Sequence, residues 1–499
     1  MSRKVVVLLM GAAMAVAVIA TAGMALAQEI GEPPSDPSGL VATAASNSRI
    51  DLTWADNATN ETAYAVERSL DSSGGWVDLT STLPADTTIY SDTGLSADTA
   101  YHYRVKATNA TGSSGYSNTA GTKTHALAPA SPTLNPTPDS TWMTNGTVYS
   151  MIRYGDYVYV GGNFTRAMRA PGGQSFAATN LARFNANTGV GDPTWTPDVT
   201  GTDMTTTQVY ALAAAGGKIW VGGKFEAVDG VARRNLAAVS PATGVLDPIV
   251  DPIIGSATSG AVRALLASST KVYVGGGFTT FDGKSRSNLG ALDFSGNVDP
   301  AWKPKASSSV RSLASSCDGA TVFAGGTFRN AAGSNGVYSP RYSLARFTAT
   351  DGSLHPWAIP AAVVGNDEGA IDLSVTCERI TVAYQGPNYA RSFRLDDGNS
   401  GTLAWANKCG GDPQAVAMLG PDKVVIGGHF SQIKRVKRVR IALVNLSDGS
   451  VVPGWSPAVE GHWMGPWDLL VDENHLFVGG RFTTVGGLTQ YNFARFTFS

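Results

Sequence analysis

The sequence predicts an all-β protein with two parts, a small β-sandwich followed by a ring of seven similar β-sheets. Residues 36–122 contain short runs in which apolar and polar residues alternate, as in strands with one buried face. From residue 139 onward the phrase G-G-x-F recurs at intervals of roughly 50–60 residues, a period typical of repeat folds. The 57 glycines agree with a chain of many turns.

The first 27 residues predict a signal peptide for export. Arg3 and Lys4 precede an apolar stretch from Val5 to about Ala20, and the triplet at 25–27 (Ala-Leu-Ala) fits a cleavage site. An uncleaved membrane anchor is the alternative for this stretch. No later apolar run reaches membrane-spanning length. We therefore expect a secreted, extracellular protein whose mature chain has no membrane span.

The charge and the cysteines narrow the classes of function further. The net charge of −2 gives no support to a nucleic-acid partner. An oxidising compartment permits one disulfide among Cys317, Cys377 and Cys409. Cys317 and Cys377 occupy similar places in successive repeats, which favours that pair. The cysteine spacing suits no zinc site, and we expect neither a metal nor a cofactor.

The alternating strands of residues 36–122 include Ile50–Trp54, Tyr64–Arg68 and Tyr101–Val105. Together with Pro37, Leu40 and Leu95, this order of anchors resembles a fibronectin type III domain. The resemblance implies a seven-stranded sandwich in which the hydroxyl of Tyr101 bonds backbone at a corner. It also implies a spacer or adhesive module, not a reaction. The Ala/Pro-rich residues 123–138 predict a linker.

The G-G-x-F phrase occurs six times. Between its fourth and fifth occurrences, residues 382–387 form a degenerate copy, so the chain contains seven copies and the fifth is degenerate. Each copy contains an alternating apolar strand, the G-G strand, a third strand such as L-A-R-F, and a segment marked by tryptophan. Four strands without an intervening helix form one blade of a β-propeller. The residues of the phrase are Gly161, Gly162 and Phe164; Gly222, Gly223 and Phe225; Gly275, Gly276 and Phe278; Gly325, Gly326 and Phe328; Gly427, Gly428 and Phe430; Gly479, Gly480 and Phe482.

The N-terminal part of the repeat region is predicted to complete the last blade. The seventh copy ends after its third strand, whereas Asp139-Ser-Thr-Trp142 resembles the Asp192-Pro-Thr-Trp195 segment of the first copy. Residues 139–145 would therefore supply the missing fourth strand and leave no open sheet edge. The alternative is an open array with a frayed N-terminal strand. On the favoured interpretation, residues 139–499 form a seven-bladed propeller closed by an N-terminal strand.

The repeats resemble the delta-60 repeat family of bacterial β-propellers. The V-G-G-x-F phrase, the L-A-R-F strand and the D-P-x-W segment carry this resemblance. It implies the fold and a bacterial source, but it indicates almost nothing about the activity. The fifth copy departs from the pattern, so we expect an irregular fifth blade.

The glycine phrase is predicted to be structural. Its variable position holds Asn163, Lys224, Gly277, Thr327, His429 and Arg481, a set that no single reaction requires. The glycines would allow a positive φ or a bulge and a close backbone approach, while the phenylalanine packs between blades. No catalytic motif is present. Among the histidines, His429 and His462 are the candidates for a functional role. The carboxylates Asp367, Glu368 and Asp372, and those of residues 396–399, are interpreted as turn residues, with a Ca²⁺ site or an acid–base pair as the alternative.

Basic residues gather in the loops that join second and third strands, which lie on one face of a propeller. A basic face on a chain of net charge −2 predicts attraction of an anionic partner. The alternative is pairing of these arginines with carboxylates of adjoining loops, such as Glu368 and Asp412. The predicted ligand-binding residues are Lys434, Arg435, Lys437, Arg438, Arg440, Arg233, Arg234 and Arg341.

These observations predict an exported, non-catalytic binding or structural protein. Its ligand would be an anionic polysaccharide, a cell-wall polymer or another surface protein, held on the basic face or at the mouth of the central channel. The alternative is an extracellular polysaccharide-acting enzyme, a glycosidase or lyase, with a fibronectin-like accessory module. Two carboxylates in the channel mouth would favour the enzyme.

Overall fold

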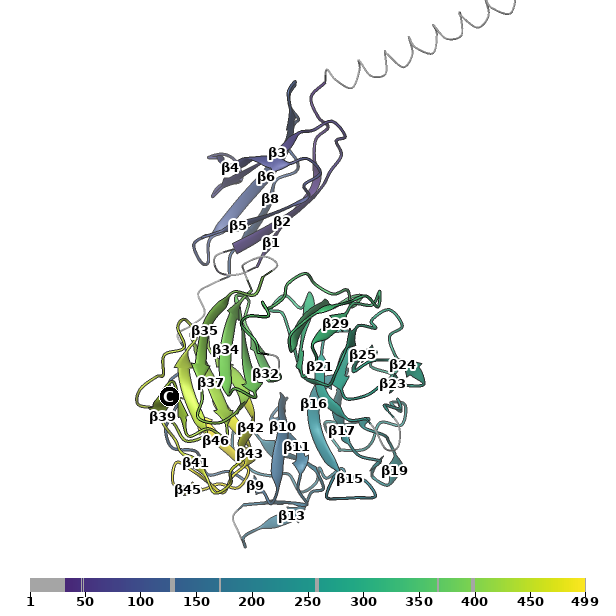
Figure 1. The fold of residues 1–499 in the computed structure, drawn as a ribbon, viewed down its shortest axis with the longest axis vertical. Helices are drawn as coiled ribbons and strands as arrows, with labels where there is room; N and C mark the ends of the chain where they lie inside the picture. The colour runs from purple at the N-terminus through teal and green to yellow at the C-terminus, as the bar shows by residue number, and fades with distance from the viewer. Residues whose placement is uncertain are drawn as a thin grey trace, which may run out of the picture. The chain divides into compact units, whose positions relative to one another are not determined.

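A computed structural model describes residues 32–45, 47, 49–125, 131–169, 172–255, 260–365, 368–395 and 400–498 (Figure 1). Within these ranges all regular elements are β-strands, and no helix is long and apolar enough to cross a membrane. The chain divides into two compact units, Met1–Ala128 and Pro129–Ser499. The predicted signal peptide, Asp367, residues 396–399 and part of the predicted linker lie outside the described residues.

Unit 1 is a β-sandwich around a core that contains Trp54, Tyr64 and Tyr103. The backbone N–H of Ser96 donates to the hydroxyl of Tyr101 at 3.0 Å, which is the corner that the resemblance implied. One sheet consists of β1 (Ser38–Ala44), β2 (Arg49–Ala55) and β5 (Ile89–Thr93). The other consists of β4 (Val77–Pro84), β3 (Ala63–Ser69), β6 (Ala100–Asn109), β7 (Gly112–Ser113) and β8 (Ala120–Lys123).

The described part of unit 2 contains seven main antiparallel sheets built from successive segments of the chain, besides six smaller sheets of short strands. Their strands, sheet by sheet, are β10 (Thr147–Tyr154), β11 (Tyr157–Asn163) and β14 (Leu181–Asn185); β16 (Gln208–Ala215), β17 (Lys218–Lys224) and β20 (Leu236–Val239); β21 (Val262–Ala267), β22 (Val272–Gly276) and β25 (Leu289–Leu292); β27 (Val310–Ser315), β28 (Thr321–Gly326) and β31 (Leu344–Thr348); β32 (Gly369–Val375), β33 (Arg379–Gln385), β34 (Tyr389–Arg394) and β35 (Leu403–Lys408); β36 (Pro413–Leu419), β37 (Lys423–Gly428) and β40 (Ile441–Asn445); and β42 (Gly465–Val471), β43 (His475–Arg481) and β46 (Phe493–Thr497).

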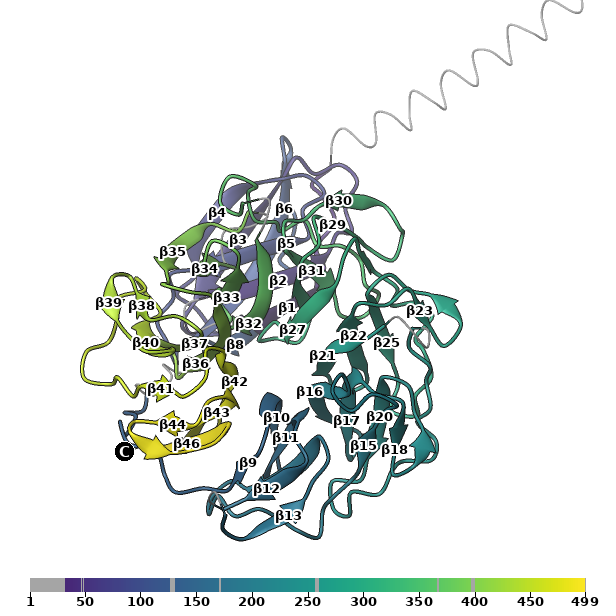
Figure 2. The same cartoon turned by 60° about the horizontal axis from the view of Figure 1, so that its bottom comes forward.

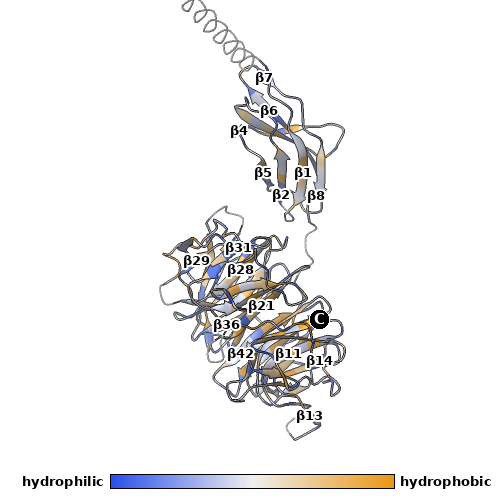
Figure 3. Cartoon of the chain, turned by 90° about the vertical axis from the view of Figure 1, so that its right-hand side faces the viewer, coloured by the Kyte–Doolittle hydropathy of each residue, from blue (hydrophilic) through white to orange (hydrophobic). Residues whose placement is uncertain are grey.

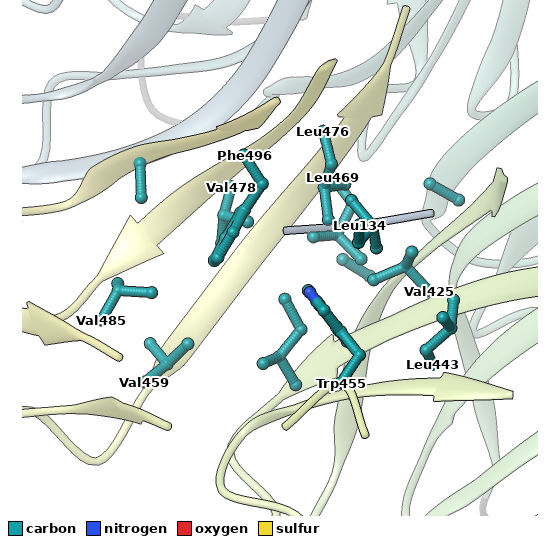
Figure 4. Packing of buried hydrophobic residues seen from close by; sticks show 14 of the residues in the cluster. Leu134, Val425, Leu443, Trp455, Val459, Leu469, Leu476, Val478, Val485 and Phe496 are labelled. Atoms are coloured by element: carbon teal, nitrogen blue, oxygen red, sulfur yellow. The ribbon is translucent and has the colours of Figure 1, made fainter. Parts of the chain in front are cut away.

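The first strands of successive sheets contact one another in chain order, and β42 of the last sheet contacts β10 of the first (Figure 2). The apolar residues lie along the strands (Figure 3) and form core layers between neighbouring sheets. In one such layer, Leu134 packs with Leu443 of the sixth sheet and with Leu469 and Phe496 of the seventh (Figure 4). Leu134 comes from the segment before the first sheet, so both ends of unit 2 share one core.

In six of the main sheets one isolated bridge, such as Phe184 to Gly191, stands in place of the predicted fourth strand. The D-x-x-W turn explains this, because the Asp192 carboxylate accepts the N–H of Thr194 and bends the chain out of the ladder. Six sheets also carry a hairpin that the sequence did not predict, between their second and third strands. The hairpins are β12 (Arg166–Met168) with β13 (Ser175–Ala177), β18 (Ala227–Val228) with β19 (Val231–Ala232), β23 (Thr280–Phe281) with β24 (Lys284–Ser285), β29 (Asn330–Ala332) with β30 (Tyr338–Pro340), β38 (Gln432–Ile433) with β39 (Val436–Lys437), and β44 (Thr484–Val485) with β45 (Leu488–Thr489).

The segment that bonds the last strand lies slightly earlier than the predicted residues 139–145. Leu134 bridges Phe498, and the N–H of Asp139 donates to the carbonyl of Arg495 at 2.8 Å. β9 (Met143–Thr144) instead pairs with β12, the outer hairpin of the first sheet. Three further short strands join the outer hairpins in the same way: β15 (Val199–Thr200), β26 (Lys305–Ala306) and β41 (Val459–Glu460).

The fifth sheet differs from the irregular blade that the degenerate copy predicted. It is a complete four-stranded meander, β32-β33-β34-β35. Because this copy lacks the G-G-x-F phrase and its hairpin, β33 turns straight back into β34 through Gly386 and Asn388, both with positive φ. The two strands therefore pair along their full lengths.

Candidate functional site

Every first strand of the seven sheets contains a β-bulge opposite the glycine pair or its counterpart. In the first sheet Val148 pairs with Gly162 and Ser150 pairs with Gly161, so Tyr149 is an extra residue. The same shift recurs in the other six sheets. A bulge redirects the side chain of its extra residue. The seven bulged residues are Tyr149, Tyr210, Arg263, Arg311, Ile371, Gln414 and Trp467.

The glycines are required by close approach and not by backbone conformation. None of the twelve glycines of the phrase, all of which are described, has a positive φ, so that part of the expectation is wrong. A Cβ at Gly162 would collide with the carbonyl oxygen of Thr147, and one at Gly161 would lie 2.5 Å from a methyl of Val209 in the next sheet. The glycine pair therefore admits both the bulged strand and the neighbouring sheet. The six phenylalanines of the phrase are buried in the core layers.

The seven bulged side chains line one cavity of about 430 Å³. Three aromatic residues from successive sheets form one side of it. The ring centroid of Tyr149 lies 5.7 Å from that of Trp467 and 5.5 Å from that of Tyr210. Arg263 follows in the next sheet, with its guanidinium 4.8 Å from the Tyr210 ring centroid, and Arg311 comes after it. The cavity thus has an aromatic arc beside a cationic arc.

Two hydrogen-bond donors of these arcs are buried and have no partner among the described residues. They are the Nε of Arg311 and the indole Nε1 of Trp467. Arg311 donates from Nη1 to the side-chain oxygen of Gln385 at 3.0 Å, which orients the guanidinium. Burial lowers the pKa of Arg311 from its ordinary value, and the charge of Arg263 lowers it further. A polar or anionic ligand in this cavity would satisfy the donors and offset the repulsion between the two arginines.

Two carboxylates line the same cavity, each one position after a bulge. Asp372 accepts from the Ser312 hydroxyl at 3.1 Å and from the backbone N–H of Val416 in the next sheet at 2.9 Å. Asp468 accepts from the backbone N–H of Met151 at 2.5 Å. Burial raises the pKa of Asp372 to about 6. Burial, together with the negative charge of Asp372, raises the pKa of Asp468 to about 7.

Asp372 is the one cavity residue that the sequence pattern indicated as a candidate, and the others were not predicted. The signal was present in the first strands, which align on the position opposite the first glycine. The three residues that end at this position read VYS, VYA, VRA, VRS, AID, PQA and PWD. The middle letter is the bulged residue, and the last is small or aspartate. Without the register, these letters look like ordinary strand positions.

Several of the predicted ligand-binding arginines donate hydrogen bonds to backbone carbonyls. Arg233, Arg341 and Arg438 occupy equivalent positions and reach the carbonyls of Asp247, His355 and Val452. Arg440 likewise donates to the carbonyl of Val459 at 2.7 Å. These guanidiniums hold the connections between sheets, and their role in a ligand-binding face stays a prediction. In the same region Arg391 pairs with buried Glu368, which agrees with the alternative of internal pairing.

Of the other four predicted basic residues, three are exposed and one is half-buried. Lys434, Arg435 and Lys437 are exposed on the β38–β39 hairpin, with Lys434 and Arg435 at its turn. Arg234 is half-buried in the wall of a second hollow, which Arg263 also lines. None of the eight predicted residues, all of them described, lines the central cavity.

The cysteines and histidines flagged in the sequence occupy structural places. Cys317 and Cys377 form a disulfide with a Cα–Cα distance of 5.1 Å, which links the turns before β28 and β33. Cys409 is buried and free. The Nε2 of His429 accepts from the backbone N–H of Asp412 at 3.2 Å, and His462 stacks on Trp463.

Residues 35–123 match the family model of the fibronectin type III domain. No curated protein matches the chain. Among solved structures, a Fn3-like protein from Clostridium thermocellum is 30% identical over 19% of this chain and 98% of its own, with a TM-score of 0.17. A segment of titin is 27% identical over 19% of this chain and 33% of its own, with the same TM-score. The family match identifies residues 35–123 as a fibronectin type III β-sandwich.

Proposed function

We propose that the chain is an exported bacterial binding protein in which the fibronectin sandwich is a spacer and residues 131–498 form a seven-bladed β-propeller of the delta-60 repeat type. Two features support the propeller: the cyclic contacts of the first strands, and the bonds from residues 134–139 to the last strand. The V-G-G-x-F phrase supports the family. The non-catalytic, binding role rests on the central cavity.

The proposed ligand is an anionic saccharide, such as a unit of an acidic polysaccharide or cell-wall polymer. The observation that carries this proposal is the aromatic arc of Trp467, Tyr149 and Tyr210 beside the cationic arc of Arg263 and Arg311. Aromatic faces provide large apolar area for the C–H face of a sugar ring. Guanidinium groups recognise carboxylate or sulfate through paired hydrogen bonds.

A titration of matched oligosaccharides tests the proposal. The mature chain should bind an acidic oligosaccharide and lose at least tenfold in affinity when Arg311 is replaced by glutamine, with little binding of the neutral counterpart. The matched control is Lys437→Gln, which removes one exposed positive charge outside the cavity. If Lys437→Gln weakens binding and Arg311→Gln does not, the ligand lies on the exposed hairpin and the cavity proposal is wrong.

A polysaccharide-acting enzyme is the second candidate, favoured by the two carboxylates of the cavity. Glycosidases use such a pair as acid and base or nucleophile, and raised pKa values suit the acid. Carboxylate oxygens of Asp372 and Asp468 nevertheless already accept hydrogen bonds from backbone N–H groups of neighbouring sheets. This occupation favours the binding role. Hydrolysis or elimination of the bound oligosaccharide that disappears in both Asp372→Asn and Asp468→Asn would establish the enzyme instead.

A further inference from the structure

The fibronectin sandwich carries a carboxylate cluster that the proposed saccharide site does not use. Asp56 follows β2, Glu61 precedes β3, and Asp86 lies between β4 and β5. One carboxylate oxygen from each residue lies within 4.8 Å of the other two. In the part of the chain that the structure describes, no lysine or arginine forms an ion pair with any of them. Three acidic groups thus lie close together, and no basic side chain of the described residues balances their charge.

Glu61 shows that the cluster is more than an exposed acidic turn. Its side chain is buried, with 8% exposure. Its Oε1 accepts from the backbone N–H of Asp86 at 3.1 Å, but its Oε2 is buried and has no hydrogen-bond partner in the part of the chain that the structure describes. A buried carboxylate oxygen without a donor is unfavourable. It therefore indicates a partner that completes the site.

The neighbouring hydrogen bonds hold the cluster in place. The Oδ1 of Asp56 accepts from the N–H of Ala58 at 3.0 Å and from the hydroxyl of Tyr64 at 2.5 Å. Tyr64 is itself fully buried in the sandwich core. The core therefore fixes Asp56, and the backbone of Asp86 fixes Glu61. Two of the three acidic side chains are oriented before any ligand arrives.

We propose that Asp56, Glu61 and Asp86 bind a calcium ion. The site offers only oxygen, which suits a hard cation. Ca²⁺ accepts variable arrangements of oxygen ligands, whereas Mg²⁺ requires a near-ideal octahedron and usually keeps several waters. Three carboxylates from two loops, with oxygens within 4.8 Å of one another, therefore suit calcium better. Water would complete the coordination, and a dissociation constant of about 10⁻⁴–10⁻³ M is expected, as in extracellular modules.

Terbium luminescence provides a direct test, because Tb³⁺ replaces Ca²⁺ and is sensitised by a nearby tyrosine. Titration of the full chain with Tb³⁺ should give emission excited through Tyr64, and Ca²⁺ should displace the terbium at lower concentration than Mg²⁺ does. Glu61→Gln should weaken the terbium affinity at least tenfold. Asp78→Asn, which removes an exposed carboxylate from β4 of the same sandwich, is the matched control and should bind as the wild type does.

A second readout separates binding from damage to the fold. Millimolar Ca²⁺ should raise the unfolding temperature of the sandwich in the wild type and in Asp78→Asn, but not in Glu61→Gln. If Glu61→Gln does not fold, Asp86→Asn takes its place, because asparagine tolerates the positive φ of residue 86. Equal terbium affinity in the wild type and the folded cluster variant would overturn the proposal, as would the lack of any calcium-dependent shift in the wild type.

Discussion

The carboxylate of Asp468 in β42 accepts the backbone N–H of Met151 in β10 at 2.5 Å, so a side chain joins the last sheet to the first. The equivalent Ser150 accepts the N–H of Leu212 in the second sheet at 3.0 Å, and Asp372 accepts that of Val416 in the sixth at 2.9 Å. In each case the residue after the bulge lies both at the cavity wall and at the seam between sheets. Cavity chemistry and stability are therefore coupled.

Replacement of Asp468 by asparagine should stabilise the protein at alkaline pH. Asparagine keeps an oxygen for the Met151 N–H but carries no charge. The folded pKa of Asp468, about 7, lies above the ordinary value of 3.8, so the folded state holds a proton that the unfolded state releases. Wild-type stability must then fall as the pH rises from about 4 to about 7. We expect Asp468→Asn to gain about 1–2 kcal/mol at pH 8, a value discounted because the carboxylate lines the cavity and is partly exposed.

Denaturant unfolding at pH 8 and pH 4 measures this effect. The advantage of Asp468→Asn should disappear at pH 4, where the wild-type carboxyl is also neutral. Asp448→Asn, at an exposed turn, serves as the control and should show no comparable gain at pH 8. A variant that is less stable than the wild type at pH 8 would show that the charge itself strengthens the seam.

The third copy of the glycine phrase contains a matched pair for testing the close approach. A Cβ on Gly275 would lie 2.6 Å from a methyl of Val310 in the next sheet, whereas one on Gly277 meets nothing closer than 3.5 Å. Neither glycine has a positive φ. We expect Gly275→Ala to destabilise by about 1–3 kcal/mol through overpacking. Gly277→Ala should be neutral or slightly stabilising, and equal effects in thermal unfolding would contradict this account.

The buried pair of Arg391 and Glu368 should be costly to break on one side only. Both side chains are almost fully buried, at 7% and 4% exposure. Glu368→Gln leaves the guanidinium without its counter-charge, and we expect denaturant unfolding to show a loss of about 3–5 kcal/mol. The double variant, Glu368→Gln with Arg391→Met, should recover much of this loss. The partly exposed pair of Arg49 and Asp51 is the contrast, worth at most about 1 kcal/mol.

Ring closure by the N-terminal segment can be tested by truncation. A fragment that begins at residue 131 keeps Leu134 and Asp139, whose carboxylate accepts from the Arg495 Nε at 2.9 Å. A fragment that begins at residue 146 lacks both and exposes the edge of β46. We expect it to unfold at a lower temperature and to self-associate, because an open strand edge pairs with other chains. Identical melting and a monomeric state for both fragments would favour an open array.

Much of the strand pattern could be predicted from local sequence. Alternation places the core faces of strands such as β2 and β6. The recurrence of the glycine phrase predicts seven units, and the described residues of unit 2 contain seven main sheets. The equivalent turns of Cys317 and Cys377 even suggested the disulfide partners. These features depend on near neighbours or on the repeat period, which the sequence displays directly.

By itself, then, the sequence determined where strands form, how often they repeat and that the glycine pair is structural. Only the tertiary structure decided which side chains meet. Arg263 and Trp467 lie about two hundred positions apart, yet a bulge in each first strand directs both into one cavity. Conversely, the sequence predicted Arg233 and Arg341 as surface charges, whereas the structure shows that they donate hydrogen bonds to backbone carbonyls 14 positions away. Long-range pairing, which no local pattern encodes, assigned these residues to the cavity or to the scaffold.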